Sequence, residues 1–401
     1  MQVRGSWTGE TFRVNKYMTS SGICPGNRLS SDITLMSVRA SSVFALLVLI
    51  GCTQGSLQGD RGSTVPRFEV DPFWPRTLPN HWMLGEVSGV SVDRNDHIWI
   101  FQRPGTLTER ETAAAQSPPA SECCVPAPSV IEFDQEGNVV QAWGREDPTR
   151  QWFTSEHGLQ VDGEGNVWLS GSNIKDDVVL KMSGDGKQLM QIGEWGKSMG
   201  SNDPDHLGGP ADIAVDLPSN EVYVSDGYRN RRIIVFDALT GKYKRHWGAY
   251  GDRPDDSPLL PYSAKEAPIR SFRNPHAVVI SKDEQVYVAD RPNNRIQVFT
   301  KDGKFQMEGF LAKATLMTGA IWDMAFSQDE AQTFLYVADG MNMKIWIVQR
   351  STLEVVGSFG EGGRSAGQLG WVHNLATDSK GNLYTVEVTP GRRIQKFRLM
   401  N

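Results

Sequence analysis

Three of the 7 histidines in this sequence stand at the same point of a recurring pattern, each at the start of a short apolar run: His157 in "HGLQVD", His276 in "HAVVIS" and His373 in "HNLATD". A lone histidine usually forms a local hydrogen bond and nothing more. Three imidazoles that face one point, however, suit a divalent transition metal, with a fourth position left for water or substrate. The repeated setting therefore favours a three-histidine site, provided that the fold brings the three runs together.

Three further side chains have types that suit chemistry beside a metal. "SDGYRNRR" places Tyr228 in a polar turn, "ADRPNNR" places Arg291 at the equivalent point of the next unit, and "IFQRPG" places Arg103 there in the first unit. A phenol beside a metal can act as a base, and guanidinium groups bind carboxylates with paired hydrogen bonds. Each arginine taken alone could equally be a solvated turn residue. Together they indicate catalysis on a substrate that carries a carboxylate.

The elements that must position these residues are short strands in repeated hairpins. Three of the hairpins are closely similar: "VYVSDGYRNRRIIVFD", "VYVADRPNNRIQVFT" and "LYVADGMNMKIWIVQ". Each has an apolar strand, a turn rich in Asp, Gly or Asn, and a second alternating strand, and another short apolar strand precedes it. Four short strands that recur at a spacing of tens of residues are typical of a propeller blade. A solenoid or a sandwich explains the repeat less economically.

Counting the leading strands predicts an all-β fold, a six-bladed β-propeller. The six strands are "SGVSVD", "HGLQVD", "ADIAVD", "HAVVIS", "WDMAFS" and "HNLATD", and their first residues are Ser88, His157, Ala211, His276, Trp322 and His373. Because the innermost strand of each blade lines the channel, histidines on alternate blades converge on the axis. The sequence therefore predicts a Zn²⁺ site there. The stretch from Pro104 to Pro128 is expected to be a loop insertion in the first hairpin.

Composition limits the remaining possibilities. The 401 residues are 39% hydrophobic and 22% charged, which allows a large core. A net charge of −6 without a basic stripe argues against nucleic acid as a partner. The adjacent Cys123 and Cys124 in "SECCVPAP" are expected to be two free, buried thiols, since neighbouring cysteines form only a strained disulfide.

The N-terminal region is typical of an export signal. Arg39 precedes an apolar run from Val43 to Ile50 that is too short to span a membrane. "LIGC" resembles the lipobox of bacterial lipoproteins, so Cys52 is the expected lipidation site. We interpret residues 1–35 as an over-long gene start before Met36, residues 36–51 as the signal peptide, 52–66 as a linker and 67–401 as the propeller. The expected location is the bacterial cell envelope. The protein is expected either at the membrane surface, where the N-terminal lipid would be its only membrane anchor, or in the periplasm.

In these motifs the sequence resembles the peptidyl-α-hydroxyglycine α-amidating lyase (peptidylamidoglycolate lyase) family of NHL-repeat propellers, from about Phe68 to Asn401. The resemblance is strongest in "VSDGYRNRRIIVF", "NPHAVVI" and "VHNLATDSKGNLYTVE". It implies that the three histidines hold zinc, that Tyr228 is the base, and that Arg103 and Arg291 orient the substrate carboxylate. The implied reaction cleaves the N–Cα bond of a peptidyl-α-hydroxyglycine, or a related carbinolamide, to an amide and glyoxylate. It also implies a structural Ca²⁺ near the channel, and we expect a monomer that acts on a small peptide or amide.

Four positions depart from the family pattern. Trp371 stands where the family has a methionine, Asn374 stands where it has an acid, and Arg229 and Val286 stand where it has disulfide cysteines. These differences leave open a non-catalytic, surface-anchored NHL propeller that binds a protein or glycan partner. A propeller hydrolase such as a lactonase is a third alternative, ranked last because such sites use several carboxylates and Asn around calcium.

Overall fold

The computed structural model describes residues 64–145 and 151–400. The interpreted extension (1–35), signal (36–51) and lipidation site Cys52 lie outside these residues, as does most of the linker. Apart from strands, the described chain has only short 3₁₀ turns: η1 (Pro104–Thr106), η2 (Ala113–Ala115), η3 (Leu217–Ser219), η4 (Ala249–Gly251) and η5 (Arg291–Asn293). None of the helical segments described has the length and apolar character that crossing a membrane requires.

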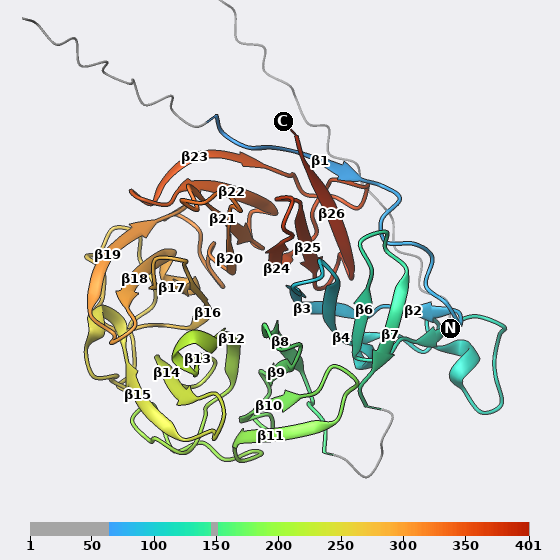
Figure 1. The fold of residues 1–401 in the computed structure, drawn as a ribbon, viewed down its shortest axis with the longest axis horizontal. Helices are drawn as coiled ribbons and strands as arrows, with labels where there is room; N and C mark the ends of the chain where they lie inside the picture. Colours follow the sequence, from blue (N-terminus) through green and yellow to red (C-terminus); the bar gives the residue numbers. More distant parts are fainter. Residues whose placement is uncertain (1–63, 146–150, 401) are drawn as a thin grey trace, which may run out of the picture. The chain divides into compact units, whose positions relative to one another are not determined.

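The described strands form six four-stranded antiparallel sheets around a central channel, as predicted (Figure 1). From the channel outward, blade one consists of β3 (Glu86–Val92), β4 (Ile98–Arg103), β6 (Val130–Phe133) and β7 (Val139–Trp143). Blade two consists of β8 (Glu156–Val161), β9 (Val167–Gly171), β10 (Val178–Met182) and β11 (Gln188–Gly193). Blade three consists of β12 (Pro210–Asp216), β13 (Glu221–Asp226), β14 (Arg232–Asp237) and β15 (Tyr243–Trp247).

The second half of the ring repeats this order. Blade four consists of β16 (Pro275–Ile280), β17 (Gln285–Asp290), β18 (Arg295–Thr300) and β19 (Phe305–Phe310). Blade five consists of β20 (Asp323–Phe326), β21 (Phe334–Asp339), β22 (Lys344–Gln349) and β23 (Glu354–Phe359). Blade six consists of β24 (Val372–Thr377), β25 (Leu383–Glu387), β26 (Arg393–Met400) and β1 (Arg67–Asp71). The innermost strands are those that the sequence predicts.

Blade six joins the two ends of the described chain. Its outermost strand, β1, pairs antiparallel with β26, so that Phe68 lies opposite Leu399 and Val70 opposite Phe397. Figure 1 shows this contact as a blue strand beside a dark red one. The ring is thus closed by backbone hydrogen bonds between segments more than 300 residues apart in the chain.

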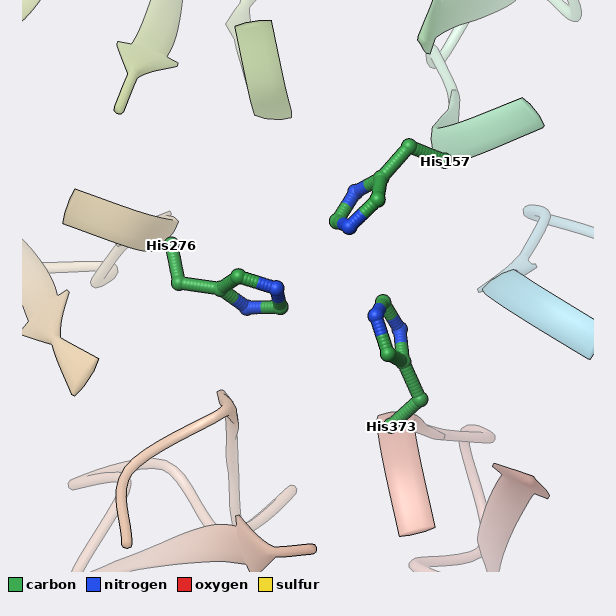
Figure 2. Close-up of side chains that lie close together, drawn as sticks. All are labelled: His157, His276 and His373. Carbon is green, nitrogen blue, oxygen red and sulfur yellow. The ribbon is translucent and has the colours of Figure 1, made fainter. Parts of the chain in front are cut away.

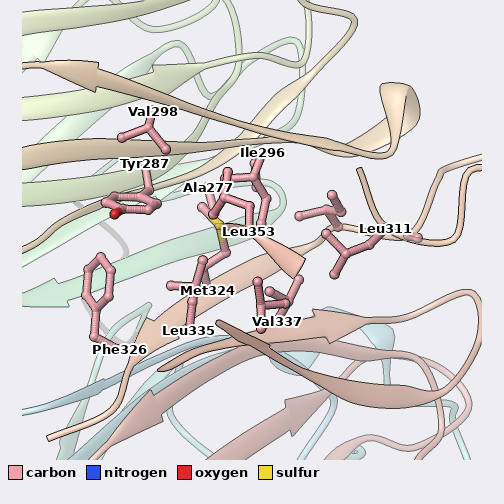
Figure 3. Close-up of a cluster of buried hydrophobic side chains, with 14 residues drawn as sticks. Ala277, Tyr287, Ile296, Val298, Leu311, Met324, Phe326, Leu335, Val337 and Leu353 are labelled. Atoms are coloured by element: carbon pink, nitrogen blue, oxygen red, sulfur yellow. The ribbon is translucent and has the colours of Figure 1, made fainter. Parts of the chain in front are cut away.

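The hydrophobic core lies between neighbouring blades. Within the described chain there are six buried clusters, one for each pair of adjacent blades. In the cluster between blades four and five, Tyr287 and Val298 pack against Met324, Phe326 and Leu335 (Figure 3). Each blade therefore buries both of its faces, which agrees with the burial of side chains on both faces of the inner strands. Full burial of one such side chain contributes about 1.5–3 kcal/mol.

The first hairpin contains the expected insertion between β4 and β6. Its strand β5 (Val125–Pro126) pairs in parallel with β2 (Trp82–Met83). The expectation of two free, buried thiols in this insertion is wrong. Cys123 and Cys124 are joined by a disulfide, and Cys123 is exposed while Cys124 is half-buried. The insertion lies outside the packed blades, so no core surrounds the two sulfur atoms.

Candidate metal centre

A β-bulge shapes the start of the inner strands. The pairing of inner and second strands skips one or two residues in five blades: Ser88, His157 with Gly158, Ala211, His276 and His373. A bulged residue leaves the ladder, so its side chain and carbonyl group can be aimed elsewhere. At Gly158 a Cβ would lie 2.6 Å from the carbonyl oxygen of Ala211, so this close approach of two inner strands requires glycine.

The bulges aim three imidazoles at one point on the axis. Figure 2 shows His157, His276 and His373 projecting from three inner strands toward a common centre. Their ring centroids are 4.7–5.0 Å apart, and a ligand nitrogen from each lies within 4.8 Å of the others. All three are buried. The predicted convergence of the three histidines is confirmed.

Each imidazole is held by a backbone carbonyl of the following blade. Distances of 2.6–2.7 Å join Nδ1 to oxygen in three pairs: His157 to Ala211, His276 to Trp322 and His373 to Ser88. A carbonyl oxygen can only accept, so Nδ1 carries the proton and Nε2 of the neutral ring keeps its lone pair. Contacts of this kind orient metal-binding histidines and fix their tautomer. The even blades thus supply the imidazoles and the odd blades hold them.

Burial lowers the pKa of all three histidines. For His157 the charges of His373 and Arg103 add to the effect of burial, and for His276 the charge of Arg291 does so. Burial, with Arg103 and Arg291, lowers the pKa of His373 to about 3. The rings are therefore neutral at neutral pH, which is the form in which imidazole binds a metal.

Tyr228 completes the centre from the turn between β13 and β14. Its hydroxyl lies 2.7 Å from Nε2 of His157 and 3.3 Å from Nε2 of His276. The phenol oxygen therefore points at the same place as the imidazole lone pairs.

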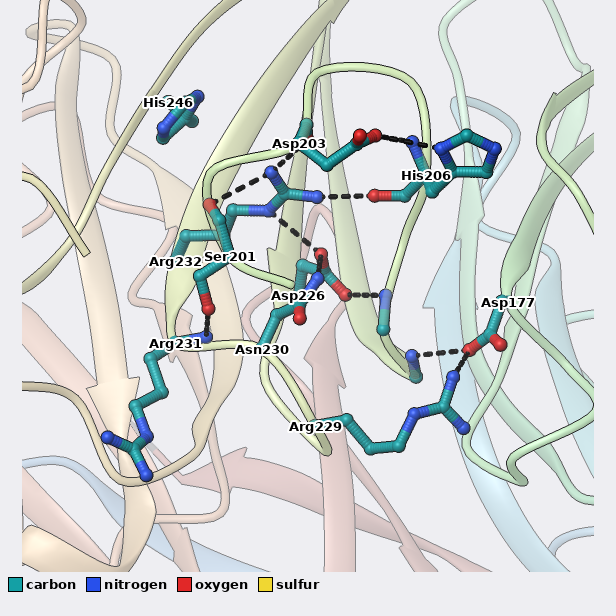
Figure 4. Close-up of polar contacts among 12 residues, drawn as sticks. Asp177, Ser201, Asp203, His206, Asp226, Arg229, Asn230, Arg231, Arg232 and His246 are labelled. Atoms are coloured by element: carbon teal, nitrogen blue, oxygen red, sulfur yellow. Dashed lines mark hydrogen bonds and ion pairs between the residues drawn. The ribbon is translucent and has the colours of Figure 1, made fainter. Parts of the chain in front are cut away.

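A buried polar network fixes the turn that carries Tyr228 (Figure 4). Asp226 accepts hydrogen bonds from Nε of Arg232 at 2.9 Å and from the amide of Gly208 at 2.7 Å. The next residue of the turn, Arg229, contacts Asp177 of blade two. Arg229 stands where the family that the sequence resembles has a disulfide cysteine. In this chain, an ion pair between blades two and three occupies that position.

Arg291 is held between two aromatic rings. Its guanidinium carbon lies 4.6 Å from the ring centroid of Trp322 and 5.7 Å from that of Tyr228. The side chain is buried, and its Nε atom has no hydrogen-bond partner within the described residues. A buried donor without a partner is costly. Arg291 is therefore prepared to bind an acceptor that enters the site.

Arg103 has partners already. Its Nη1 atom lies 2.7 Å from a carboxylate oxygen of Glu86, and its Nε donates to the carbonyl of Glu156 at 2.7 Å. Burial raises the pKa of Glu86, but hydrogen bonds from Thr389 and Arg103 outweigh it and lower the pKa. The sequence reasoning missed Glu86, because nothing in "LGEVSG" marks it as the partner of an arginine 17 residues later.

A cavity of about 600 Å³ gives access to the centre, and its walls include the three predicted catalytic residues: Arg103, Tyr228 and Arg291. His373 also borders it. Trp322 and Trp371, with ring centroids 5.9 Å apart, form an aromatic wall. Trp371, the departure from the family pattern, therefore faces the space that a substrate would fill.

Two carboxylates deeper in the channel were also missed. Asp212 and Asp323 are buried one residue after the first positions of the third and fifth inner strands, so the alignment that revealed the histidines contained them. Burial raises the pKa of Asp212, and burial with the charge of Asp212 raises that of Asp323. They line a second cavity of about 290 Å³ with Asn374, at the opposite end of the inner strands.

Fold and site together define a six-bladed propeller with a three-histidine centre, and the comparisons with known proteins agree with the fold. The NHL repeat family matches residues 207–236 and 272–299. Over 353 residues the chain is 26% identical to peptidyl-alpha-hydroxyglycine alpha-amidating lyase 1 of Drosophila melanogaster, covering 81% of this chain and 58% of that protein. It is 27% identical over 242 residues to peptidylglycine alpha-amidating monooxygenase of Rattus norvegicus, covering 59% of this chain.

The alignment with the rat protein spans only 22% of that protein's length. The chain contains NHL repeats and is similar to the amidating lyases, as the sequence motifs indicate. Among solved structures, a protein of unknown function from Bacteroides thetaiotaomicron superposes with a TM-score of 0.50 at 13% identity, covering 79% of this chain and 70% of that one. This likeness supports the propeller fold alone.

Proposed function

We propose that this chain is a zinc-dependent lyase that cleaves the N–Cα bond of a peptidyl-α-hydroxyglycine, or a related carbinolamide, to an amide and glyoxylate. The observation that carries the proposal is the convergence of three neutral imidazoles and the Tyr228 hydroxyl on one point. This point lies beside a cavity lined by Tyr228, His373 and Arg291, whose buried Nε has no partner among the described residues. The names of the similar proteins support the same reaction class.

The residues present fit a divalent transition metal. Three Nε2 lone pairs converge, and each ring is fixed through Nδ1 by a carbonyl that no metal would displace. Three histidines with one open position are a typical catalytic zinc set. When bound, such an ion supplies Lewis acidity that polarises the substrate hydroxyl.

Arg291 is the residue that we expect to bind the substrate carboxylate. Its guanidinium faces the cavity between Trp322 and Tyr228, and its buried Nε lacks a partner among the residues described. Arg103 shares its charge with Glu86, so we expect it to align the carboxylate more weakly. A bound carboxylate would then lie beside Tyr228, which places the neighbouring hydroxyl within reach of the phenol oxygen.

Tyr228 is the proposed base. Removal of the substrate hydroxyl proton lets the carbon–oxygen bond become the carbonyl of glyoxylate while the N–Cα bond breaks. The departing amide nitrogen gains one proton, which the same phenol can return. The reaction therefore balances without an oxidant, a reductant or water. Placement of a general base typically contributes about 10²–10⁴-fold in rate.

We further propose that the Asp212 and Asp323 carboxylates hold a structural Ca²⁺. Both are buried in the channel, where the amides of Val278 and Leu375 donate to them at 3.1 and 2.9 Å. Carboxylate and carbonyl oxygens are the ligands that Ca²⁺ prefers. Asn374, in place of the family's acid, contacts Nδ1 of His373. The negative charge that this position lacks is thus present on the inner strands of blades three and five.

The experiment that tests the function is direct. Purified protein with its metal is mixed with a synthetic α-hydroxyglycine-extended peptide, and glyoxylate and peptide amide are measured. We expect the two products in equal amounts, a strongly reduced rate in Tyr228→Phe and no reaction after metal removal. Absence of product from the wild-type protein, with a glycan or protein partner retained by the same face, would instead support the binding propeller. Export and lipidation of Cys52 are tested separately by mass analysis of the mature N-terminus.

A further inference from the structure

A second group of metal-ligating side chains lies away from the axis, at the end of blade one. Asp93 and His97 belong to the turn between β3 and β4, and Glu132 lies on β6. One ligand atom from each lies within 4.8 Å of the others. We propose that Asp93, His97 and Glu132 bind a divalent transition metal, independent of the three-histidine centre.

The chain's own repeats show what is unusual in blade one. In blades two and six the same turn begins with Asp162 or Asp378, and the fifth residue is an asparagine whose amide donates to that aspartate at 3.1 or 2.8 Å. In blade one the fifth residue is His97. The backbone of the turn is unchanged, since the amide of Asp93 still donates to the carbonyl of the fifth residue at 3.0 Å.

The residue across the ladder has changed as well. The aromatic residue two positions after the turn pairs with Lys181 in blade two and with Lys396 in blade six, and these lysines lie over the rings of Trp168 and Tyr384. The equivalent partner of Trp99 in blade one is Glu132. An asparagine and a lysine have thus been replaced by an imidazole and a carboxylate at one place.

The exchange leaves blade one short of positive charge. Lys181 and Lys396 bring a cation to an aspartate-bearing turn, whereas blade one combines Asp93 with Glu132. Within the described residues, neither carboxylate forms an ion pair with a lysine or an arginine. Glu132 is 7% exposed, and its contacts are Nδ1 of His97 at 2.6 Å and Nε2 of Gln141 at 2.6 Å. A bound divalent cation would neutralise both carboxylates.

The geometry suits such an ion after a small adjustment. Ligand atoms on a tetrahedral zinc are about 3.4 Å apart when each bond is about 2.1 Å. The three candidate atoms lie within 4.8 Å of one another, and His97, whose side chain is 30% exposed, would exchange its Nδ1 contact with Glu132 for the ion. One nitrogen and two oxygens, with water at the remaining position, form an acceptable zinc set.

The test compares zinc binding by the full chain with two variants that copy the other blades. His97→Asn and Glu132→Lys introduce the residues that blades two and six use at these positions, so both variants are expected to fold. Each should bind one equivalent of Zn²⁺ fewer than the wild-type protein in a chelator competition. The difference is expected whether or not the axial histidines bind metal, so failure of the lyase proposal leaves it intact.

A matched control excludes a general effect of charge. Glu136→Lys alters an exposed residue of the next turn by the same charge and should keep the wild-type stoichiometry. Zinc should also raise the unfolding temperature of His97→Asn less than that of the wild type. Equal stoichiometry in the wild type, His97→Asn and Glu132→Lys would overturn the proposal, as would an equal loss in the Glu136 control.

Discussion

The hydroxyl of Tyr228 lies 2.7 Å from Nε2 of His157, although the two residues are 71 positions apart and belong to neighbouring blades. The contact joins the proposed base to the proposed metal ligands. It also shows that the first residues of β8, in blade two, and the turn between β13 and β14, in blade three, lie at the same end of the propeller. Replacement of either residue should therefore affect a different part of the same reaction.

Tyr228→Phe should reduce kcat by about 10²–10⁴-fold, because it removes the proposed base. The imidazoles remain, so the metal content should not change. Glyoxylate release and metal analysis on the same preparation provide the measurement. Tyr243→Phe, whose hydroxyl contacts only the surface residue His246 in the described chain, is the matched control. A Tyr228→Phe variant with full activity would rule out the phenol as the base.

His276→Ala should lose the axial metal, because two imidazoles seldom retain zinc at low concentration. Metal content per chain, measured after dialysis against a weak chelator, checks this expectation. His246→Ala, at a histidine on the outermost strand of blade three that contacts Tyr243, should keep the wild-type value. Equal metal in both variants would remove the basis for the axial site.

Arg291→Met should lower kcat/KM for a carboxylate-bearing substrate by about 10- to 100-fold, since a hydrogen bond to a charged group contributes about 1.5–3 kcal/mol. Arg103→Met should have a smaller effect on binding, because Glu86 already shares its charge. A substrate whose carboxylate is replaced by an amide should react equally poorly with the wild type and with Arg291→Met. If it does not, Arg291 has another role.

Removal of Ca²⁺ should destabilise the propeller, because Asp212 and Asp323 then repel each other in a buried channel. Thermal unfolding with added Ca²⁺ or a selective chelator measures the effect. Asp323→Asn should be less sensitive to the chelator than the wild type, and more stable than the wild type once Ca²⁺ is absent. Identical responses of the two proteins would show that these carboxylates bind no calcium.

Acid should weaken the contact between Glu221 and Arg245. Burial raises the pKa of Glu221, but hydrogen bonds from Arg245, Lys244 and Tyr223 outweigh it and lower the pKa to about 2. A depressed carboxylate pKa stabilises the fold above the unfolded-state value, and this stabilisation is lost as the pH falls toward the folded-state value. Its size at neutral pH is at most about 3 kcal/mol.

Arg245→Met should therefore be less stable than the wild type at pH 7, and the difference should shrink between about pH 4.5 and 2. Chemical unfolding at a series of pH values measures it. Arg350→Met, which breaks an ion pair with the exposed Asp283, should change stability much less. A difference that stays constant with pH would contradict the assignment to Glu221.

The sequence was sufficient for the blades and for the convergence of the three histidines. Repeated hairpins reveal both the period and the inner strands, and alternate blades of a closed ring must face one axis. The same alignment contained Asp212 and Asp323, yet aspartates are frequent in the turns of this chain and did not stand out. Backbone carbonyls such as that of Ala211, which orients His157, have no sequence marker at all.

Long-range pairings could not be predicted for a related reason. The strand β1 has no neighbouring hairpin partner in sequence, because its partner β26 lies at the other end of the described chain. The pairing of Glu86 with Arg103 depends on the register of β3 and β4, which places the two residues opposite each other. The prediction of free thiols at Cys123 and Cys124 is wrong because it rested on the strain of a disulfide between neighbouring cysteines, yet the two sulfur atoms are joined.

The union of β1 with β26 also constrains how the protein is made. Residues 67–71 are synthesised more than 300 residues before their partner strand, residues 393–400. A nascent chain that lacks β26 therefore carries an open arc of blades, and the histidines at positions 157, 276 and 373 cannot meet until blade six has been synthesised. An ion that needs all three imidazoles could therefore bind only after the sixth blade has been made, and shorter nascent chains would not compete for it.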